Sequence, residues 1–219
     1  MVDFSTISFR DLVDCLGDYI GDAPIHFTPK AELNPENYVL CVFIGEEETD
    51  AIRRGVHNKE FQYDNSDVGL HFPEITIDCY YHLEEARNPI AQEINMGYLQ
   101  KNRKTYHEEK NLWFALFCVL HEIGHWKHFK QSGLSAIDYE KSIHDISKKY
   151  KEIGDIIFSM PNFHPLKMVY AEKYHKESHE QIPSEKAADE YALDHFDEAL
   201  SMVRKALGYD EEWLSFHSY

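Results

Sequence analysis

Apolar residues are densest in one unbroken run, Leu112–Leu120, which leads directly into the sequence HEIGH at positions 121–125. Because nine consecutive apolar residues leave a helix no polar face, a helix over this run is expected to be buried on all sides. A capping box of Thr105 and Glu108 predicts its start, and Gly133 predicts its end. We therefore expect this helix to form the centre of the fold.

The segments before this helix predict a short helix and two strands. Residues 8–20 carry apolar side chains at steps of three and four behind Ser8, which is typical of an amphipathic helix with a serine N-cap. Tyr38–Ile44 is β-branched and aromatic and is predicted to be a buried strand, whereas the alternation over Glu74–Cys79 predicts a half-buried strand. Residues 82–101 are expected to be helical in two pieces.

The region after the central helix repeats apolar side chains in alternating steps of three and four over residues 135–158. This pattern indicates an amphipathic helix that lies on the core; the alternative is a coiled-coil-like seam that binds a partner. The polar stretch 166–181 contains His175 and His179, which are expected to be solvated rather than to form a surface metal pair.

The last periodic segment, residues 184–207, is predicted to be a helix capped by Ser184. Its apolar face consists of Ala188, Tyr191, Ala192, Phe196, Ala199, Leu200 and Val203. Together these elements predict an α+β fold, in which a small antiparallel or mixed sheet packs on the central helix and the C-terminal half is helical. A chain of 219 residues with 43% hydrophobic residues can bury a core as a single domain, 1–219.

The net charge of −17 speaks against nucleic acid and anionic membrane surfaces as direct partners. No basic segment followed by an apolar one marks a signal peptide at the start, and the longest apolar run is too short to span a bilayer, so a cytoplasmic protein is expected. The cysteines form no CxxC pair and are expected to be small core residues in a reducing compartment. They are Cys15, Cys41, Cys79 and Cys118.

The HEIGH sequence places His121 and His125 one helical turn apart on the same face, where both imidazoles can bind one zinc ion. Glu122 lies beside them, in the position of a general base toward water. The alternative is an acidic helix end with incidental histidines, because the pattern fixes only three positions. However, a buried apolar run carries these side chains into the interior, where polar groups need partners and a metal ion is a common one. We therefore predict a Zn²⁺ site.

A catalytic zinc ion takes three protein ligands, so a third is expected elsewhere in the chain. Gln131 occupies the position at which one class of zinc peptidases has its third histidine, which excludes that class. His128 lies close to two turns from His121 and is expected to be a surface or outer-sphere residue.

A second class takes a glutamate from a later helix, with an aspartate one turn beyond it that orients a zinc-bound histidine. The last helix offers Glu185 with Asp189, and in the same form Glu190 with Asp194. The spacing alone leaves both registers open, and Glu185 could also be a first-turn acid favoured by the helix dipole.

HEIGH followed by E-x-x-A-D-x-Y-A resembles the ImmA/IrrE group of gluzincin-like metallopeptidases. The second motif consists here of Glu185, Ala188, Asp189, Tyr191 and Ala192. The resemblance implies Glu185 as third ligand, Asp189 as the outer-sphere carboxylate and a zincin-like fold. It also implies an edge strand beside the motif helix, expected at Glu74–Cys79, to which substrate adds as an extended strand.

The chain departs from that group in the spacing of its motifs, because about sixty residues separate His125 from Glu185 where the group has a much shorter segment. A helical insertion at about 134–183 is therefore expected between the two metal-ligand helices. The apolar ending that often follows the second motif is absent.

The expected function is that of a zinc metalloendopeptidase acting on a restricted protein or peptide substrate, such as the helix-turn-helix repressors cleaved in the resembled group. The alternative is a zinc-stabilised interaction or regulatory module without turnover. Four residues of the insertion are candidates to assist the oxyanion: Tyr170, Tyr174, His164 and His175.

Overall fold

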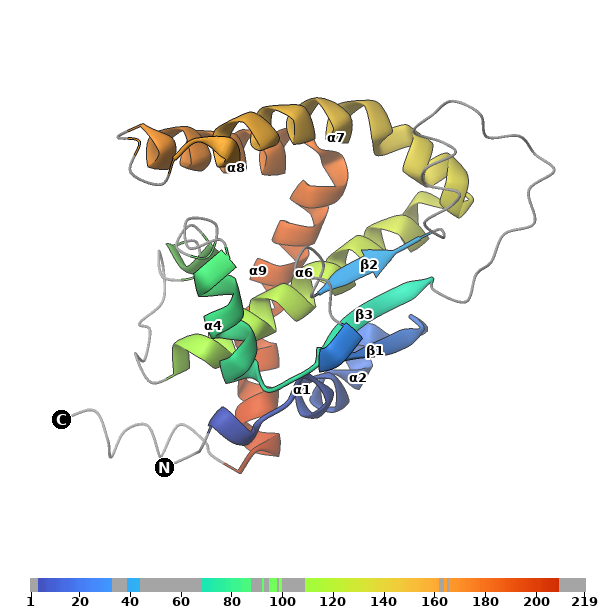
Figure 1. The fold of residues 1–219 in the computed structure, drawn as a ribbon. Coiled ribbons are helices and arrows are strands. Elements are labelled where there is room, and N and C mark those ends of the chain that lie inside the picture. The colour runs from blue at the N-terminus through green and yellow to red at the C-terminus, as the bar shows by residue number, and fades with distance from the viewer. Residues whose placement is uncertain are drawn as a thin grey trace.

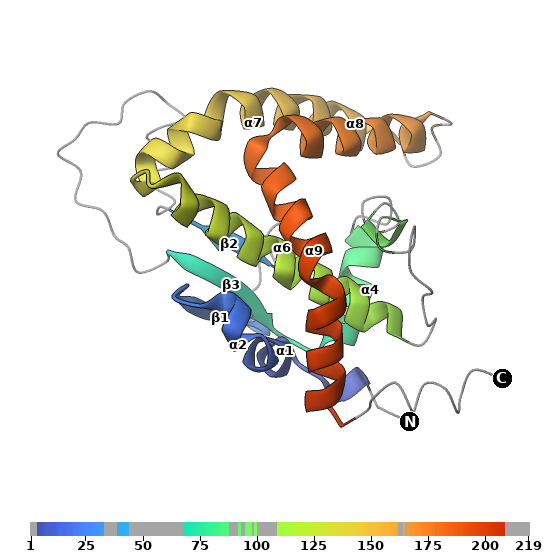
Figure 2. The same cartoon turned by 180° about the vertical axis from the view of Figure 1, so that it is seen from behind.

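Helix α6 (Lys110–Ser132) crosses the middle of the molecule, with the sheet on one side and helix α9 (Pro183–Ala206) on the other (Figures 1 and 2). The computed structural model describes residues 4–32, 39–43, 68–87, 92, 95–97, 99, 109–161, 164 and 166–208. Within these ranges the fold is α+β and mostly helical, with a three-stranded mixed sheet, as the sequence predicts.

The other described elements follow the chain from a short N-terminal helical turn to a pair of long helices. In order they are η1 (Phe4–Thr6), α1 (Phe9–Cys15), α2 (Gly17–Ile20), β1 (Ile25–Pro29), η2 (Lys30–Glu32), β2 (Leu40–Val42), β3 (Gly69–Glu74), α4 (Ile77–Arg87), α7 (Ala136–Ser159) and α8 (Lys167–Gln181).

The apolar run of α6 is buried on all sides, which confirms the sequence prediction. Apart from Cys118, each residue from Leu112 to Leu120 is at most 5% exposed. On one side Trp113 packs edge-on against Phe196 of α9, with ring centroids 5.3 Å apart, and on the other Phe114 stacks on Tyr80 of α4 at 5.6 Å. Each large side chain buried in this way contributes about 1.5–3 kcal/mol, so the core is built around α6.

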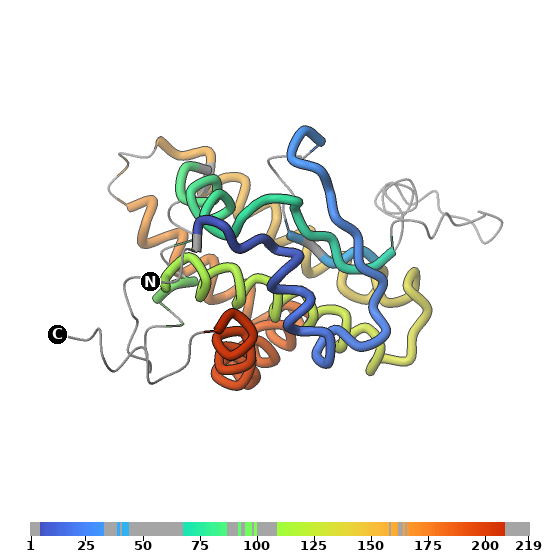
Figure 3. The backbone as a smooth tube through the Cα atoms, turned by 90° about the horizontal axis from the view of Figure 1, so that it is seen from below, coloured from blue at the N-terminus to red at the C-terminus, as the bar shows by residue number. Residues whose placement is uncertain are grey.

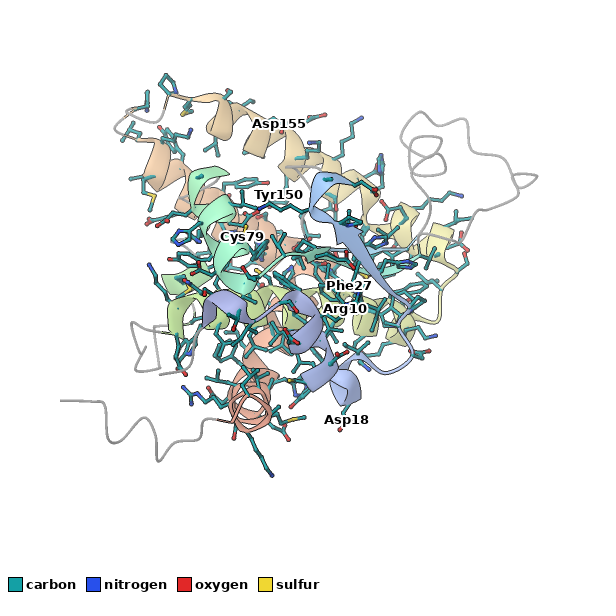
Figure 4. The ribbon with its side chains drawn as sticks, turned by 60° about the horizontal axis from the view of Figure 1, so that its bottom comes forward. Arg10, Asp18, Phe27, Cys79, Tyr150 and Asp155 are labelled. Carbon is teal, nitrogen blue, oxygen red and sulfur yellow. The ribbon has the colours of Figure 1, made fainter. Side chains whose placement is uncertain are left out.

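The sheet has the order β1-β3-β2, with β3 parallel to β1 and antiparallel to β2. Leu70 and Phe72 of β3 are fully buried beneath α1, and β2 and β3 both contact α6. Arg10 of α1 lies over the ring of Phe27 at 4.0 Å, as Figure 4 shows, and donates to Glu74 at 2.8 Å. The first helix is thereby attached to the sheet.

The strand predicted at Glu74–Cys79 is wrong. The strand ends at Glu74 and helix α4 begins at Ile77, because the Thr76 hydroxyl accepts from the Cys79 backbone N–H at 3.2 Å and caps the new helix. Ile75 and Ile77 are both buried, so a strand end followed by a helix start produced the same alternation as a strand. β3 is also the middle strand of the described sheet, so the predicted edge position is wrong as well.

The first predicted helix, residues 8–20, is interrupted at Leu16 and forms α1 and α2. Ser8 is its N-cap, in a capping box with Asp11. The strand predicted at Tyr38–Ile44 is present as β2 within the described residues.

The predicted helix at 82–101 begins earlier, at Ile77, and its first piece ends at Arg87; most of the rest lies outside the described residues. The capping box predicted at Thr105 and Glu108 also lies outside them. At the other end α6 stops at Gly133 as predicted, with a left-handed φ of 66°.

Helices α7 and α8 form an antiparallel hairpin at one end of the molecule (Figures 1 and 2). The segment predicted as a helical insertion is thus helical. The expectation that its first helix lies on the core is wrong, because α7 packs mainly along α8. Its base is anchored by Tyr139, which is 1% exposed and packs against Phe43 and Phe129.

Helix α9 runs from α8 back along α6 and is seen nearly end-on beside it in Figure 3. Its predicted cap is wrong: Pro183 occupies the first turn, Ile182 is the N-cap residue, and Ser184 is buried. The predicted apolar face is buried except for Tyr191, which is half-buried. The fully packed positions are Ala188, Ala192, Phe196, Ala199, Leu200 and Val203.

None of the helices in the described ranges combines the length and apolar composition needed to cross a membrane.

Candidate metal centre

The two helices that carry the predicted ligands touch at Gly124 of α6 and Ala188 of α9. A Cβ atom added at Gly124 would lie 2.7 Å from Ala188 Cα and 2.9 Å from its carbonyl oxygen. Such distances are too short for any side chain, so glycine at 124 and a small residue at 188 permit this close approach. The contact brings the C-terminal turns of α6 against the first turns of α9.

Three side chains converge where the helices meet: His121, His125 and Glu185. The Nε2 atoms of the two histidines are 3.1 Å apart, and Glu185 Oε2 lies 3.4 Å from His121 Nε2 and 3.7 Å from His125 Nε2. Their side chains are 14%, 11% and 31% exposed, respectively, so the cluster is partly buried but open to solvent on one side.

This donor set fits a zinc ion. Ligand atoms of a tetrahedral zinc ion bound at ordinary distances are about 3.3 Å apart, close to the three separations of 3.1, 3.4 and 3.7 Å. Two imidazole nitrogens and one carboxylate oxygen are also a ligand combination found in catalytic zinc sites, with a fourth position for water.

Asp189 lies one turn after Glu185 and approaches the other side of His121. His121 Nδ1 lies 3.0 Å from Asp189 Oδ1. Because a carboxylate only accepts, Nδ1 donates in this hydrogen bond, which leaves Nε2 as the ring nitrogen that faces the cluster and would bind a metal ion. This is the arrangement that orients a metal-binding histidine.

The electrostatics of the cluster favour a charged carboxylate and a charged imidazole. Although burial raises the pKa of Glu185, His125 and His121 hold it well below the usual range. Burial lowers the pKa of His121, but hydrogen bonds with Asp189 and Glu185 raise it well above the ordinary value. The Glu185 and Asp189 carboxylates therefore stabilise positive charge at the point where the two imidazole nitrogens converge, whether that charge is a proton on His121 or a bound cation.

Glu122 is adjacent to the cluster on α6 and half-buried. Burial raises its pKa, an effect that the neighbouring His125 and His121 oppose only in part. Glu122 lines a pocket of about 230 Å³ together with His121 and Glu185. The rest of the lining consists of Val39, Tyr80, Asn95, Phe117, Cys118, His175 and His179.

The structure distinguishes the two registers of the last helix. Glu185 faces the histidines, whereas Glu190 is 65% exposed and pairs with Lys186 at 3.8 Å, and Asp194 is exposed. His128 also lies apart from the cluster and shares a hydrogen bond of 2.7 Å with the Tyr139 hydroxyl.

Of the four candidates for oxyanion assistance, only His175 lines the pocket. Tyr170 is 41% exposed, Tyr174 packs over Gly154 of α7, and His164 accepts from the Leu166 N–H. Burial and the nearby His179 lower the pKa of His175 to about 4, so its imidazole is neutral at pH 7.

The expectation that His175 and His179 are solvated is wrong. Both rings are half-buried and line the pocket, with centroids 4.0 Å apart, and His179 Nδ1 lies 2.6 Å from Asp189 Oδ2. Their four-residue spacing was the available signal, since it places them on one helical face. The sequence did not show that this face turns toward α9.

Comparison of the chain with protein-family models, with curated proteins and with solved structures finds no match.

Proposed function

We propose that the chain is a zinc-dependent metallopeptidase with a zincin-like site, which hydrolyses a peptide bond in a protein or peptide substrate. The observation that carries this proposal is the triangle of His121 Nε2, His125 Nε2 and Glu185 Oε2, with sides of 3.1 to 3.7 Å, beside the carboxylate of Glu122. The resemblance of the two motifs to the ImmA/IrrE group supports the same function.

In this proposal His121, His125 and Glu185 hold the zinc ion, and Asp189 fixes the tautomer of His121. When bound, zinc supplies a Lewis acid that polarises a carbonyl group and makes a water molecule more acidic. Glu122 accepts the proton of the attacking water and afterwards donates it to the leaving amine. The neutral His175 imidazole lines the same pocket, and we propose that it donates a hydrogen bond to the developing oxyanion.

The proposed substrate is an extended segment that lies along β2. This strand is at the edge of the described sheet, contacts α6, and is preceded by Val39 in the wall of the pocket. Main-chain hydrogen bonds to an edge strand position a peptide without demanding a particular sequence. The net charge of −17 favours a neutral or basic protein over nucleic acid, and a repressor of the kind cleaved in the resembled group fits this description.

Cleavage assays with the wild type and Glu122→Gln test this proposal. Both proteins, loaded with zinc, are incubated with a peptide library and with purified helix-turn-helix repressors, and products are identified by mass spectrometry. We expect discrete cuts by the wild type and none by Glu122→Gln, which retains zinc. Equal cleavage by both would show that Glu122 is not the general base of the reaction.

A second candidate is a zinc-stabilised interaction module without turnover. It is favoured by exposed apolar side chains on the α7–α8 hairpin, among them Ile156, which is 64% exposed, and Val169, which is 55% exposed. Stable, zinc-dependent binding of a repressor that stays intact through long incubation would select this function over peptidase activity.

A further inference from the structure

The carboxylate of Asp189 is shared between two histidines from different helices. Its Oδ1 is 3.0 Å from His121 Nδ1 of α6, and its Oδ2 is 2.6 Å from His179 Nδ1 of α8. All three side chains are less than one-fifth exposed, at 14% for His121 and 19% for each of the other two. Three helices therefore meet through one carboxylate at the metal centre.

The shared carboxylate fixes both rings. Since an ionised carboxylate has no proton to donate, each Nδ1 atom must carry the proton of its hydrogen bond. Hydrogen bonds to a charged group are about twice as strong as neutral ones, and both lie at distances that allow a strong interaction. A change in the position of His179 is thus transmitted through Asp189 to the ring that presents Nε2 to the cluster.

Helix α8 also forms part of the pocket. His175 and His179 of this helix line it together with Glu122, their ring centroids are 4.0 Å apart, and α8 packs against α9. The base of the hairpin is held separately, by Tyr139 against Phe43 and Phe129. The hydrogen bond between His179 and Asp189 is therefore the charged link between α8 and the metal centre among the described residues.

We propose that His179 is a positioning residue that couples the α7–α8 hairpin to metal binding. Docking of α8 holds Asp189 and His121 in the orientation that binds zinc, and bound zinc in turn stabilises the docked position of α8. Such coupling is reciprocal by thermodynamic necessity, so each event must favour the other by the same factor. This inference rests on the zinc site proposed above.

The test measures zinc affinity by competition with a chelator in full-length variants. His179→Ala is expected to weaken binding about tenfold, at the lower end of the range for outer-sphere residues. His179→Asn keeps an N–H donor near the position of Nδ1 and is expected to recover most of the loss. Glu180→Ala, which removes an exposed neighbour on α8 that pairs with Lys176 at 3.8 Å, is the matched control and should bind zinc as the wild type does.

A double-mutant cycle separates coupling from a general loss of structure. In the background of Asp189→Asn, His179→Ala is expected to have no further effect on zinc affinity, since the connection is already broken. Hydrogen exchange supplies an independent measurement: zinc should slow exchange of the α8 amides in the wild type and in Glu180→Ala, but not in His179→Ala.

Two results would overturn the coupling while leaving the zinc site intact: wild-type affinity in His179→Ala, or losses that add in the double mutant. Exchange in α8 that is indifferent to zinc in the wild type would do the same. A wild-type protein that binds no zinc would instead overturn the proposed function, and the coupling with it.

Discussion

Glu109 and Arg204 form a buried ion pair that closes the end of the α6–α9 contact opposite the histidines. Arg204 Nε donates to Glu109 Oε1 at 3.1 Å, and the two side chains are 10% and 2% exposed, respectively. The two helices are thus fixed at both ends of their antiparallel contact, by this pair and by the approach of Gly124 to Ala188.

Removing one member of this pair is expected to lower the stability of the protein. Arg204→Met leaves the Glu109 carboxylate buried without its charged partner, although Trp113 Nε1 still donates to it at 3.2 Å, and we expect a loss of about 3–5 kcal/mol in the free energy of unfolding. The double variant Glu109→Leu/Arg204→Met should lose less, because no charge then remains buried, even though the Trp113 N–H loses this acceptor. Urea unfolding of both variants measures this, and an equal loss in the two would show that lost packing, not the unpaired charge, is the cause.

Substitution of Gly124 is expected to separate the ligand helices. In Gly124→Ala the new Cβ meets Ala188, so stability should fall by about 1–3 kcal/mol and zinc affinity should fall with it as Glu185 moves away. Gly17→Ala is the control, since a Cβ there has no neighbour within 4 Å and a helical glycine is replaced by a better helix former. Thermal unfolding and chelator competition should show a loss in the first variant and none in the second.

The third ligand can be tested with a matched pair of glutamates. Glu185→Ala is expected to lower zinc affinity strongly, because it removes one of three protein ligands. Glu190→Ala alters only an exposed pair with Lys186 and should bind zinc as the wild type does. Loss of zinc from Glu190→Ala with retention in Glu185→Ala would show that Glu190, and not Glu185, is the third ligand.

Cys118 should resist alkylation in the native protein. Burial raises the pKa of this thiol to about 12, although a hydrogen bond with Tyr80 opposes the effect, so the reactive thiolate is scarce at pH 8. Mass spectrometry after iodoacetamide treatment of zinc-free protein should find Cys118 modified in urea but unmodified in the native state.

The raised pKa of Cys118 also predicts how the stability of the protein depends on pH. The unfolded thiol ionises above about pH 8.5, while the native one stays neutral, so the stability that the neutral thiol contributes is lost progressively above that pH. Cys118→Ala should show a shallower decline in this range, and an unchanged profile would contradict the assignment.

The parts of the fold that could be predicted are those with long, uniform patterns. The run from Leu112 to Leu120 has no polar face, and Gly133 has no side chain to oppose a left-handed turn, so α6 and its end followed from local sequence. The apolar face of α9, from Ala188 to Val203, repeats over about four turns and was equally clear. The spacing of side chains on the last helix offered two pairs, Glu185 with Asp189 and Glu190 with Asp194, and the resemblance to the ImmA/IrrE group favoured the first.

Other features depend on tertiary contacts that no short pattern encodes. β3 contains His71 and Pro73 and lacks a simple alternation, because both neighbours in the sheet come from distant segments. His179 looked solvated since its helix is polar, yet α8 turns directly into α9 and brings the ring to Asp189. The turn between the two helices is at Ile182, which is 6% exposed, so it is buried although α8 is polar.

Zinc stoichiometry in a matched set of histidine variants tests the central claim most directly. His125→Ala removes a member of the cluster, while His128→Ala, three residues later on the same helix, removes a ring that contacts Tyr139 and lies apart from the cluster. Metal analysis of purified, zinc-exposed protein should find about one zinc ion per chain in the wild type and His128→Ala, and almost none in His125→Ala. A wild type without zinc, or a His125→Ala variant that holds as much as the wild type, would contradict the account.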